Sequence, residues 1–198
     1  MEFANILVAG VGGQGTLLAS DILAEVGMRA GLDSKKSDVL GLAVRGGSVL
    51  SHVRWGPRVA SPVVRMGDMT HMLAFEPLEA LRGIPLLDPN ASILCNTQPI
   101  MPISVSSGSG TYPSDEIITS SLSKAAKSLR LIDATAVALD VGNPRVTNVV
   151  MLGAFSSLFD LKQELWEEVV LSRVPSKYLE LNRTAFRRGR EQVSKESA

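Results

Sequence analysis

The sequence has few of the residues that build metal centres and covalent cross-links. Its 198 residues include one cysteine, Cys95, and two histidines, His52 and His71. A single thiol cannot form a disulfide within the chain, and it cannot hold an iron–sulfur cluster that needs four thiolates. A structural zinc site would have to combine all three side chains with a carboxylate. The three residues lie far apart in the sequence and do not have the spacing of a zinc motif. We therefore predict no metal site on this chain.

The sequence also lacks an excess of charge of either sign and a long hydrophobic run. Lys and Arg together number 20, as do Asp and Glu, so the formal net charge is zero. Such a chain has no overall field that would draw it to nucleic acid or to an anionic membrane surface. Residues 1–10 (MEFANILVAG) include no basic leader, and their apolar stretch is interrupted at Gly10. We expect a cytoplasmic protein with no signal peptide, no membrane span and no nucleic-acid partner.

The composition is that of an ordinary globular protein. Apolar residues make up 45% and charged residues 20% of the chain, which argues against extensive disorder. A length of 198 residues leaves little room for two independent cores, so we interpret residues 1–198 as a single domain.

A glycine-rich turn between a predicted strand and a predicted helix is the clearest local motif. Residues 4–9 (ANILVA) form a short apolar run, as expected of a strand covered on both faces. The turn GVGGQG occupies residues 10–15, and apolar side chains then recur at helical spacing through residues 17–26. A strand, a glycine turn and a helix in this order open a doubly wound α/β sheet.

The rest of the chain alternates between strand-like and helix-like segments. Strands are predicted at residues 48–55, 60–65, 69–75, 92–96 and 129–133, and helices at residues 78–82, 115–128, 134–141, 146–159, 161–172 and 176–189. Residues 97–113, rich in Pro, Ser and Gly, form the longest predicted loop. We therefore expect a three-layer α/β/α Rossmann-like sandwich with a mostly parallel central sheet and a helical C-terminal part.

The glycine turn has two open interpretations. The pattern G-x-G-x-x-G matches the dinucleotide fingerprint, in which backbone amides and the helix dipole bind a phosphate. However, the acidic residue that should end a second strand is missing, because Asp33 and Asp38 lie in a segment without a clean strand pattern. A nucleoside triphosphate loop would need a lysine directly after Gly15, where this sequence has Thr16. Alternatively, the glycines only permit close packing of strand and helix.

Other notable residues have plain structural interpretations. Glu76 and Glu79 are three residues apart at the start of a predicted helix, where negative charge is favourable. His71 and Cys95 lie in apolar strand segments and are interpreted as packed residues. The segment 146–159 is apolar all round, which predicts either a core helix or a helix at a subunit interface.

Five blocks of the sequence together carry a resemblance to a known family. They are GVGGQGTLLASDILAEV from Gly10, GLAVRGGSVLSHVRWG, HMLAFEPLEALR, NVVMLGA, and KYLELNRTAFRRG ending at Gly189. In this order they resemble the gamma-type domain of 2-oxoacid:ferredoxin oxidoreductases. Within that family the chain is most similar to the small (beta) subunit of the indolepyruvate enzymes, although Val44 stands where a Gln is expected in that group.

The resemblance implies a subunit of a larger enzyme rather than a complete catalyst. In the family, other chains or domains bind thiamine diphosphate with Mg²⁺ and the [4Fe–4S] clusters. A 2-oxo acid is oxidatively decarboxylated to an acyl-coenzyme A, and the electrons pass to ferredoxin. The implied partners are a large thiamine- and iron–sulfur-bearing subunit, a small 2-oxo acid and, indirectly, ferredoxin. This chain alone is then expected to bind no cofactor, to contribute no catalytic residue and to be inactive.

The resemblance also implies where this subunit meets the rest of the enzyme. Its glycine turn and its Arg-Gly-Gly turn would face the thiamine cofactor, coenzyme A or the catalytic chain. The implied cofactor-binding residues are Gly10, Gly12, Gly13, Gln14, Gly15, Thr16, Arg45, Gly46 and Gly47.

Several alternatives stay open at this point. Indolepyruvate or another aryl-pyruvate is the expected substrate, with pyruvate or 2-oxoglutarate as alternatives. A free-standing Rossmann oxidoreductase that binds NAD(P) or FAD is a second kind of function, and a non-catalytic docking module is a third. The isolated chain could also form a homodimer.

Overall fold

A six-stranded sheet forms the middle of the molecule in the computed structural model, which describes residues 3–40 and 46–194. The strands stand in the order β2-β3-β1-β4-β5-β6. They are β1 (Ala4–Val11), β2 (Asp33–Leu40), β3 (Ser48–Gly56), β4 (Met69–Ala74), β5 (Leu87–Asn96) and β6 (Ser128–Ile132). Strands β1, β4, β5 and β6 are parallel, whereas β3 is antiparallel to both of its neighbours.

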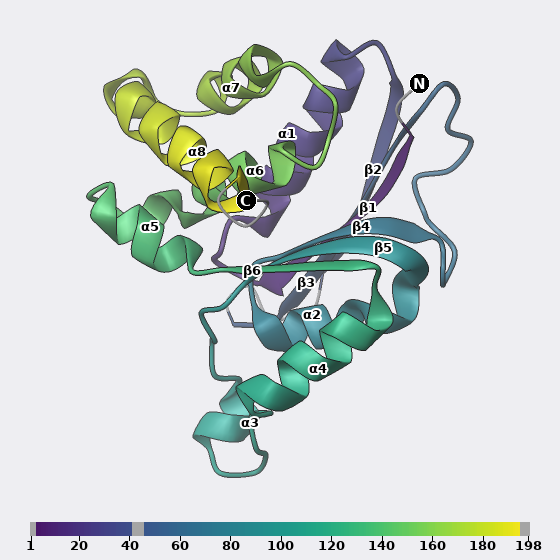
Figure 1. The fold of residues 1–198 in the computed structure, drawn as a ribbon, viewed down its shortest axis with the longest axis vertical. Helices are drawn as coiled ribbons and strands as arrows, with labels where there is room; N and C mark the ends of the chain where they lie inside the picture. The colour runs from purple at the N-terminus through teal and green to yellow at the C-terminus, as the bar shows by residue number, and fades with distance from the viewer. Residues whose placement is uncertain (1–2, 41–45, 195–198) are drawn as a thin grey trace.

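Helices cover both faces of the sheet, unequally (Figure 1). The thick face carries α1 (Thr16–Arg29), α5 (Ala134–Asp140), α6 (Thr147–Ser156), α7 (Gln163–Ser172) and α8 (Leu179–Ser194). The thin face carries α2 (Pro77–Gly83) and α4 (Asp115–Ala125), with the short α3 (Ile103–Ser106) near α4. Three short 3₁₀ helices are also described, η1 (Ile84–Leu86), η2 (Pro144–Val146) and η3 (Ser176–Tyr178).

The predicted three-layer sandwich, with its mostly parallel sheet and helical C-terminal part, is confirmed. No helix formed by the described residues is both long enough and apolar enough to cross a membrane.

The two faces of β1 belong to separate hydrophobic cores. Ile6 and Val8 join the core of the thick face, whereas Leu7 and Ala9 join that of the thin face. All four side chains are fully buried. A strand covered on both faces has a continuous apolar sequence, which is the pattern that predicted β1.

Helices α6 and α8 cross at a contact between their backbones. A Cβ atom added to Gly189 would lie 2.0 Å from the carbonyl oxygen of Val150, and one added to Gly153 would lie 2.0 Å from that of Phe186. Both positions therefore require glycine, because any larger residue would push the helices apart. Every residue of α6 from Asn148 to Ser156 is buried, so this apolar segment is a core helix of the chain itself.

Strand β2 contradicts the expectation that residues 33–40 have no strand. This segment (DSKKSDVL) pairs along its whole length with β3 and forms one edge of the sheet. An edge strand tolerates polar side chains because water reaches it. Lys36 contacts the carboxylates of Asp21 at 2.5 Å and Asp38 at 3.0 Å, so charge pairing takes the place of an apolar pattern.

The strand predicted at residues 60–65 is also wrong. Residues 57–68 instead form an irregular connection between β3 and β4. The guanidinium of Arg54 donates to the carbonyl oxygens of Ser61, at 2.8 Å, and Val63, at 3.4 Å. The Arg54 side chain thus binds carbonyl groups that would otherwise accept hydrogen bonds from a neighbouring strand. In addition, Pro62 has no N–H to donate to such a strand.

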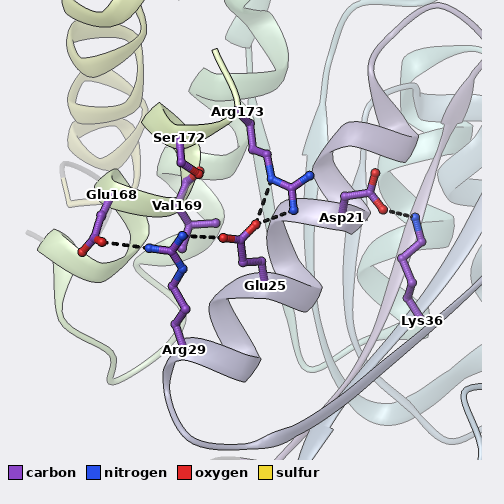
Figure 2. A network of polar contacts seen from close by, with 8 residues as sticks. All are labelled: Asp21, Glu25, Arg29, Lys36, Glu168, Val169, Ser172 and Arg173. Atoms are coloured by element: carbon purple, nitrogen blue, oxygen red, sulfur yellow. Dashed lines mark hydrogen bonds and ion pairs between the residues drawn. The ribbon is translucent and has the colours of Figure 1, made fainter. Parts of the chain in front are cut away.

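An ion-pair network ties α1 to α7 on the outside of the thick face, as Figure 2 shows. The carboxylate of Glu25 contacts Arg29 from its own helix, at 2.6 Å, and Arg173, which follows α7. Arg29 also reaches Glu168 of α7, at 2.8 Å. The Arg173 guanidinium is the main cause of a lowered pKa for the Glu25 carboxyl.

Candidate functional site

The glycine turn lies at the carboxyl end of β1, where it leads into α1. The carboxyl ends of the parallel strands β4 and β5 meet at the same edge of the sheet. In open α/β sheets, ligands bind in the crevice outside these strand ends. The turn is therefore placed where the fold class puts a binding site.

The structure brings the glycine turn and the Gly46-Gly47 turn together. The N–H of Gly12 donates to the carbonyl of Gly47 at 2.9 Å, and the N–H of Gly46 donates to the carbonyl of Gly12 at 3.2 Å. Gly46 has a φ of 74°, in the left-handed region that favours glycine. Arg45, which precedes Gly46 and Gly47 in the second predicted turn, lies outside the described residues.

Gln14 stabilises the glycine turn from inside. Its Oε1 accepts a hydrogen bond from the N–H of Val11 at 2.8 Å, and its Nε2 donates to the carbonyl of Phe75 at 2.9 Å. The side chain therefore fastens the end of β1 to the end of β4. Both polar atoms of the predicted cofactor-binding side chain are engaged within the protein itself.

The glycines of the turn divide between the two interpretations of the motif. A Cβ on Gly10 would lie 2.8 Å from Thr16 Oγ1, and one on Gly15 would lie 2.7 Å from Asn148 Nδ2. These two positions serve close packing. Gly13 has a φ of 106° and no atom within 4 Å of an added Cβ, so it forms an open tip of the turn.

The first turn of α1 offers unpaired polar groups. Its N-cap residue, Gly15, has no side chain to bind the first amides of the helix. Thr16 is 3% exposed, and its Oγ1 has no hydrogen-bond partner among the described residues. Free amides and the positive end of a helix dipole favour an anion at this position.

A cavity of about 230 Å³ opens beside the glycine turn. Its lining includes Gly13, residues 98 and 100 from the long loop, Thr135 at the start of α5, and Arg145 with Asn148 near the start of α6. Arg145 is exposed, and within residues 3–40 and 46–194 its guanidinium has no ion-pair partner. The cavity therefore combines the open tip of the glycine turn at Gly13 with one available cation, which suits an anionic ligand.

Sequence reasoning did not place Arg145 and Thr135 in the site. The one available signal was Asn148, a polar residue in an otherwise apolar segment. Its side chain lies against Gly15, so it joins α6 to the glycine turn. Arg145 comes two residues before α6. Because α6 begins beside the glycine turn, Arg145 also lines the cavity.

The buried titratable groups nearby do not supply acid–base or nucleophilic chemistry. Burial raises the pKa of the Cys95 thiol to about 12 and lowers that of His71 to about 4. Glu79 is bound by Arg82 and by Ser48 Oγ, both at 2.5 Å. Glu76 accepts a hydrogen bond from the N–H of Glu79 and begins α2, which confirms its interpretation as a charge at a helix start.

The chain's donor atoms do not fit a metal centre or a cluster. Among the described residues, no group of three or more His, Cys, Asp or Glu side chains is close enough to hold a metal ion. The single cysteine cannot ligate a [4Fe–4S] cluster alone.

Comparison with known proteins identifies the family. A family model described as pyruvate ferredoxin/flavodoxin oxidoreductase matches residues 5–192. The chain belongs to this family. The resemblance found in the sequence blocks is therefore confirmed, and the chain is a small subunit of the 2-oxoacid ferredoxin oxidoreductase type.

Curated relatives in this family cover nearly the whole chain. Indolepyruvate oxidoreductase subunit IorB of Thermococcus kodakarensis is 38% identical over 192 residues, which are 96% of this chain and 95% of the relative. The protein of the same name from Archaeoglobus fulgidus is 38% identical over 191 residues, 96% of this chain and 94% of the relative.

Two solved structures share the fold. The gamma subunit of a keto/oxoacid ferredoxin oxidoreductase from Geobacter sulfurreducens has a TM-score of 0.72 at 27% identity, covering 97% of this chain and 99% of that one. A 2-oxoglutarate:ferredoxin oxidoreductase from Magnetococcus marinus has a TM-score of 0.73 at 22% identity, and the match covers 98% of this chain but 32% of that one. This fold therefore occurs both as a separate subunit and as part of a longer chain.

Proposed function

We propose that this chain is the small subunit of a cytoplasmic enzyme that oxidises indolepyruvate or a related aryl-pyruvate with ferredoxin as acceptor. The relatives named indolepyruvate oxidoreductase subunit IorB support this substrate class, because their similarity extends over nearly the full length of the chain. The observation that carries the structural role is the cavity lined by the tip of the glycine turn, Asn148 and Arg145. It can bind an anion, whereas the residues around it offer no reactive group.

The reaction is divided between this subunit and a larger partner. The partner would bind thiamine diphosphate with Mg²⁺, which supplies the carbanion that attacks the 2-oxo carbon, and the iron–sulfur clusters that carry electrons to ferredoxin. The overall reaction converts a 2-oxo acid anion and coenzyme A to acyl-coenzyme A and carbon dioxide, and it releases one proton and two electrons, which ferredoxin accepts. This chain would contribute backbone amides, shape and one positive charge.

The ligand that best suits the cavity is coenzyme A, through its phosphate groups. Gly12, Gly46 and Gly47 bring two turns of backbone together beside the start of α1, where a phosphate is favoured. Arg145 adds a guanidinium, which pairs well with phosphate oxygens. The Magnetococcus marinus structure, of which about a third shares this fold, is described with coenzyme A and succinyl-CoA bound. The Arg45 side chain would add a second cation.

Co-expression with the thiamine-binding partner tests the proposed function. We expect the complex to reduce ferredoxin or a viologen dye with indolepyruvate and phenylpyruvate faster than with pyruvate or 2-oxoglutarate. The isolated chain should reduce neither acceptor. Activity of the chain alone, or its tight binding of NAD(P) or FAD, would instead favour a free-standing enzyme. If it bound a partner without any 2-oxo acid activity, a docking module would be favoured.

The substitution Arg145→Ala tests the cavity directly. Loss of this charge should raise the KM for coenzyme A several-fold and leave kcat nearly unchanged, because the guanidinium binds the ligand but does not take part in bond changes. Lys177→Ala, which removes an exposed cation from η3, is the matched control. Equal KM values for the two variants would contradict the placement of coenzyme A in this cavity.

A further inference from the structure

The long loop between β5 and α4 forms one wall of the candidate site. We call residues 97–113 the strap; it carries α3 and extends away from the sheet, as Figure 1 shows. Gln98 and Ile100, near its beginning, line the cavity together with Gly13 and Gln14 of the glycine turn. The position of this wall depends on what holds the strap.

A single carboxylate binds the strap near both of its ends. Glu76 Oε1 accepts hydrogen bonds from the N–H of Ile100 at 3.2 Å and from the hydroxyl of Tyr112 at 2.5 Å. Its other oxygen, Oε2, accepts from the N–H of Glu79 at 2.9 Å and so caps α2. Glu76 is 1% exposed, so these three donors replace the water that a carboxylate would otherwise bind.

The choice of glutamate at this position indicates a second role beyond the cap. Ser, Thr, Asp and Asn are the preferred N-cap residues, since a short side chain reaches the first helix amides best. A short side chain at residue 76 could cap α2, but it would stop short of the strap. All three partners of Glu76 are donors, so a carboxylate with two acceptor oxygens satisfies them whereas an amide would not.

The residue before Glu76 binds the glycine turn, which also lines the cavity. The carbonyl of Phe75 accepts from Gln14 Nε2 at 2.9 Å and from Asn96 Nδ2 at 3.3 Å. Through Gln14 it fixes the glycine turn. Two consecutive residues that follow β4 therefore bind both the glycine turn and the strap.

We propose that Glu76 is a positioning residue for the candidate site, because it holds the strap whose residues Gln98 and Ile100 line the cavity. The proposal rests on the proposed function in one respect, namely that this cavity binds coenzyme A. Tyr112 acts as the distal anchor. Burial and the Glu76 carboxylate raise the pKa of its phenol, so it remains a hydrogen-bond donor.

Hydrogen–deuterium exchange of the full chain tests the anchoring. Glu76→Asp keeps the charge and a good N-cap but shortens the side chain, and Tyr112→Phe removes the distal anchor alone. We expect both substitutions to speed exchange of the Ile100 amide and of the α3 amides several-fold, with α2 unchanged. The control is Glu167→Asp, which shortens another buried glutamate that binds Arg187 on the thick face. Unchanged exchange in the strap of both test variants would overturn the proposal.

Kinetics of the complex with its partner separate positioning from general stability. Glu76→Asp and Tyr112→Phe should raise the KM for coenzyme A several-fold with little change in kcat, and Glu167→Asp should change neither. If Arg145→Ala raises KM but the Glu76 and Tyr112 variants do not, the positioning role is wrong. If strap exchange increases and KM stays constant in all of these variants, including Arg145→Ala, the assignment of coenzyme A to the cavity fails, and with it the positioning role.

Discussion

The two faces of the sheet are built in different ways. On the thick face, α6 lies between the sheet and α8, and aromatic rings of Trp55, Phe155, Phe159 and Trp166 pack against one another at centroid distances of 5.0 to 5.9 Å. On the thin face, a single layer made by α2 and α4 covers a smaller apolar core. The strap belongs to the thin side and is held by hydrogen bonds to one buried carboxylate rather than by a core of its own.

This difference means that the part of the molecule that contributes most to stability is not the part that holds the strap beside the candidate site. The thick face buries large side chains and helix backbone, which are the main sources of folding free energy. The site draws Thr135 of α5 and Asn148 of α6 from that stable side, and Gln98 and Ile100 of the strap from the thin side. A ligand would therefore meet one fixed surface and one surface that depends on a few polar contacts.

The largest effect is expected from breaking the helix crossing of the thick face. In Gly189→Ala, the new methyl group would meet the Val150 carbonyl at 2.0 Å, so α6 and α8 must separate. We expect a loss of about 3 kcal/mol or more in the free energy of unfolding, as for severe overpacking. Urea denaturation measures it. Thr184→Ala, on the exposed side of α8, is the control and should lose almost nothing; a similar loss in both variants would contradict the close crossing.

A core truncation on the thin face should have a somewhat smaller effect. Leu122 of α4 is fully buried in the thin-face core. Leu122→Ala should lower the free energy of unfolding by roughly 2–4 kcal/mol through lost burial and a residual cavity. Near-ultraviolet circular dichroism should still report the packed tryptophans of the thick face. Loss of that signal in the folded variant would show that the two cores are not independent.

Acid should weaken the thick face through His71. Its ring packs against Phe155 and Phe159, and burial lowers its pKa to about 4. The unfolded chain binds a proton near pH 6.5 that the folded chain refuses, so stability is complete above about pH 6.5 and falls as the pH drops toward 4, by up to ~3 kcal/mol. Urea midpoints across this range measure the slope. His71→Leu should reduce it; an unchanged slope would assign the effect to other groups.

The smallest effect is expected at the surface network of the thick face (Figure 2). Arg173→Ala removes an ion pair with Glu25 that is partly open to water. Such pairs contribute about 0–1 kcal/mol, and the loss should shrink further at high salt. Thermal unfolding at low and high ionic strength checks this. A loss comparable with that of Leu122→Ala would mean that the network is part of the core.

The sequence predicts those helices and strands whose own hydrophobic pattern determines their secondary structure. Strand β1 and helix α1 were predictable because β1 is covered on both faces and α1 on one, which leaves a continuous apolar run followed by a helical period. Strand β2 was missed because it is an edge strand, and its partner β3 rather than its own composition makes it a strand. Residues 60–65 were mistaken for a strand because the Arg54 side chain binds the backbone of this loop, and the spacing of residues in the sequence does not reveal such a contact.

The candidate site was predicted only in its local part. The glycine turn follows from a glycine-rich segment visible in the sequence, whereas its hydrogen bonds with Gly46 and Gly47 were not predicted. Arg145 and the two strap contacts of Glu76 depend on long-range packing, which brings loops without any periodic pattern to the end of β4. Arg45 lies outside the described residues, so its role stays a prediction.

The close crossing of α6 and α8 has a consequence for how the protein is made. Translation completes α6 well before Gly189 leaves the ribosome, so the most apolar helix of the molecule emerges without the helix that later covers it. Nascent chains with such exposed segments aggregate or recruit chaperones.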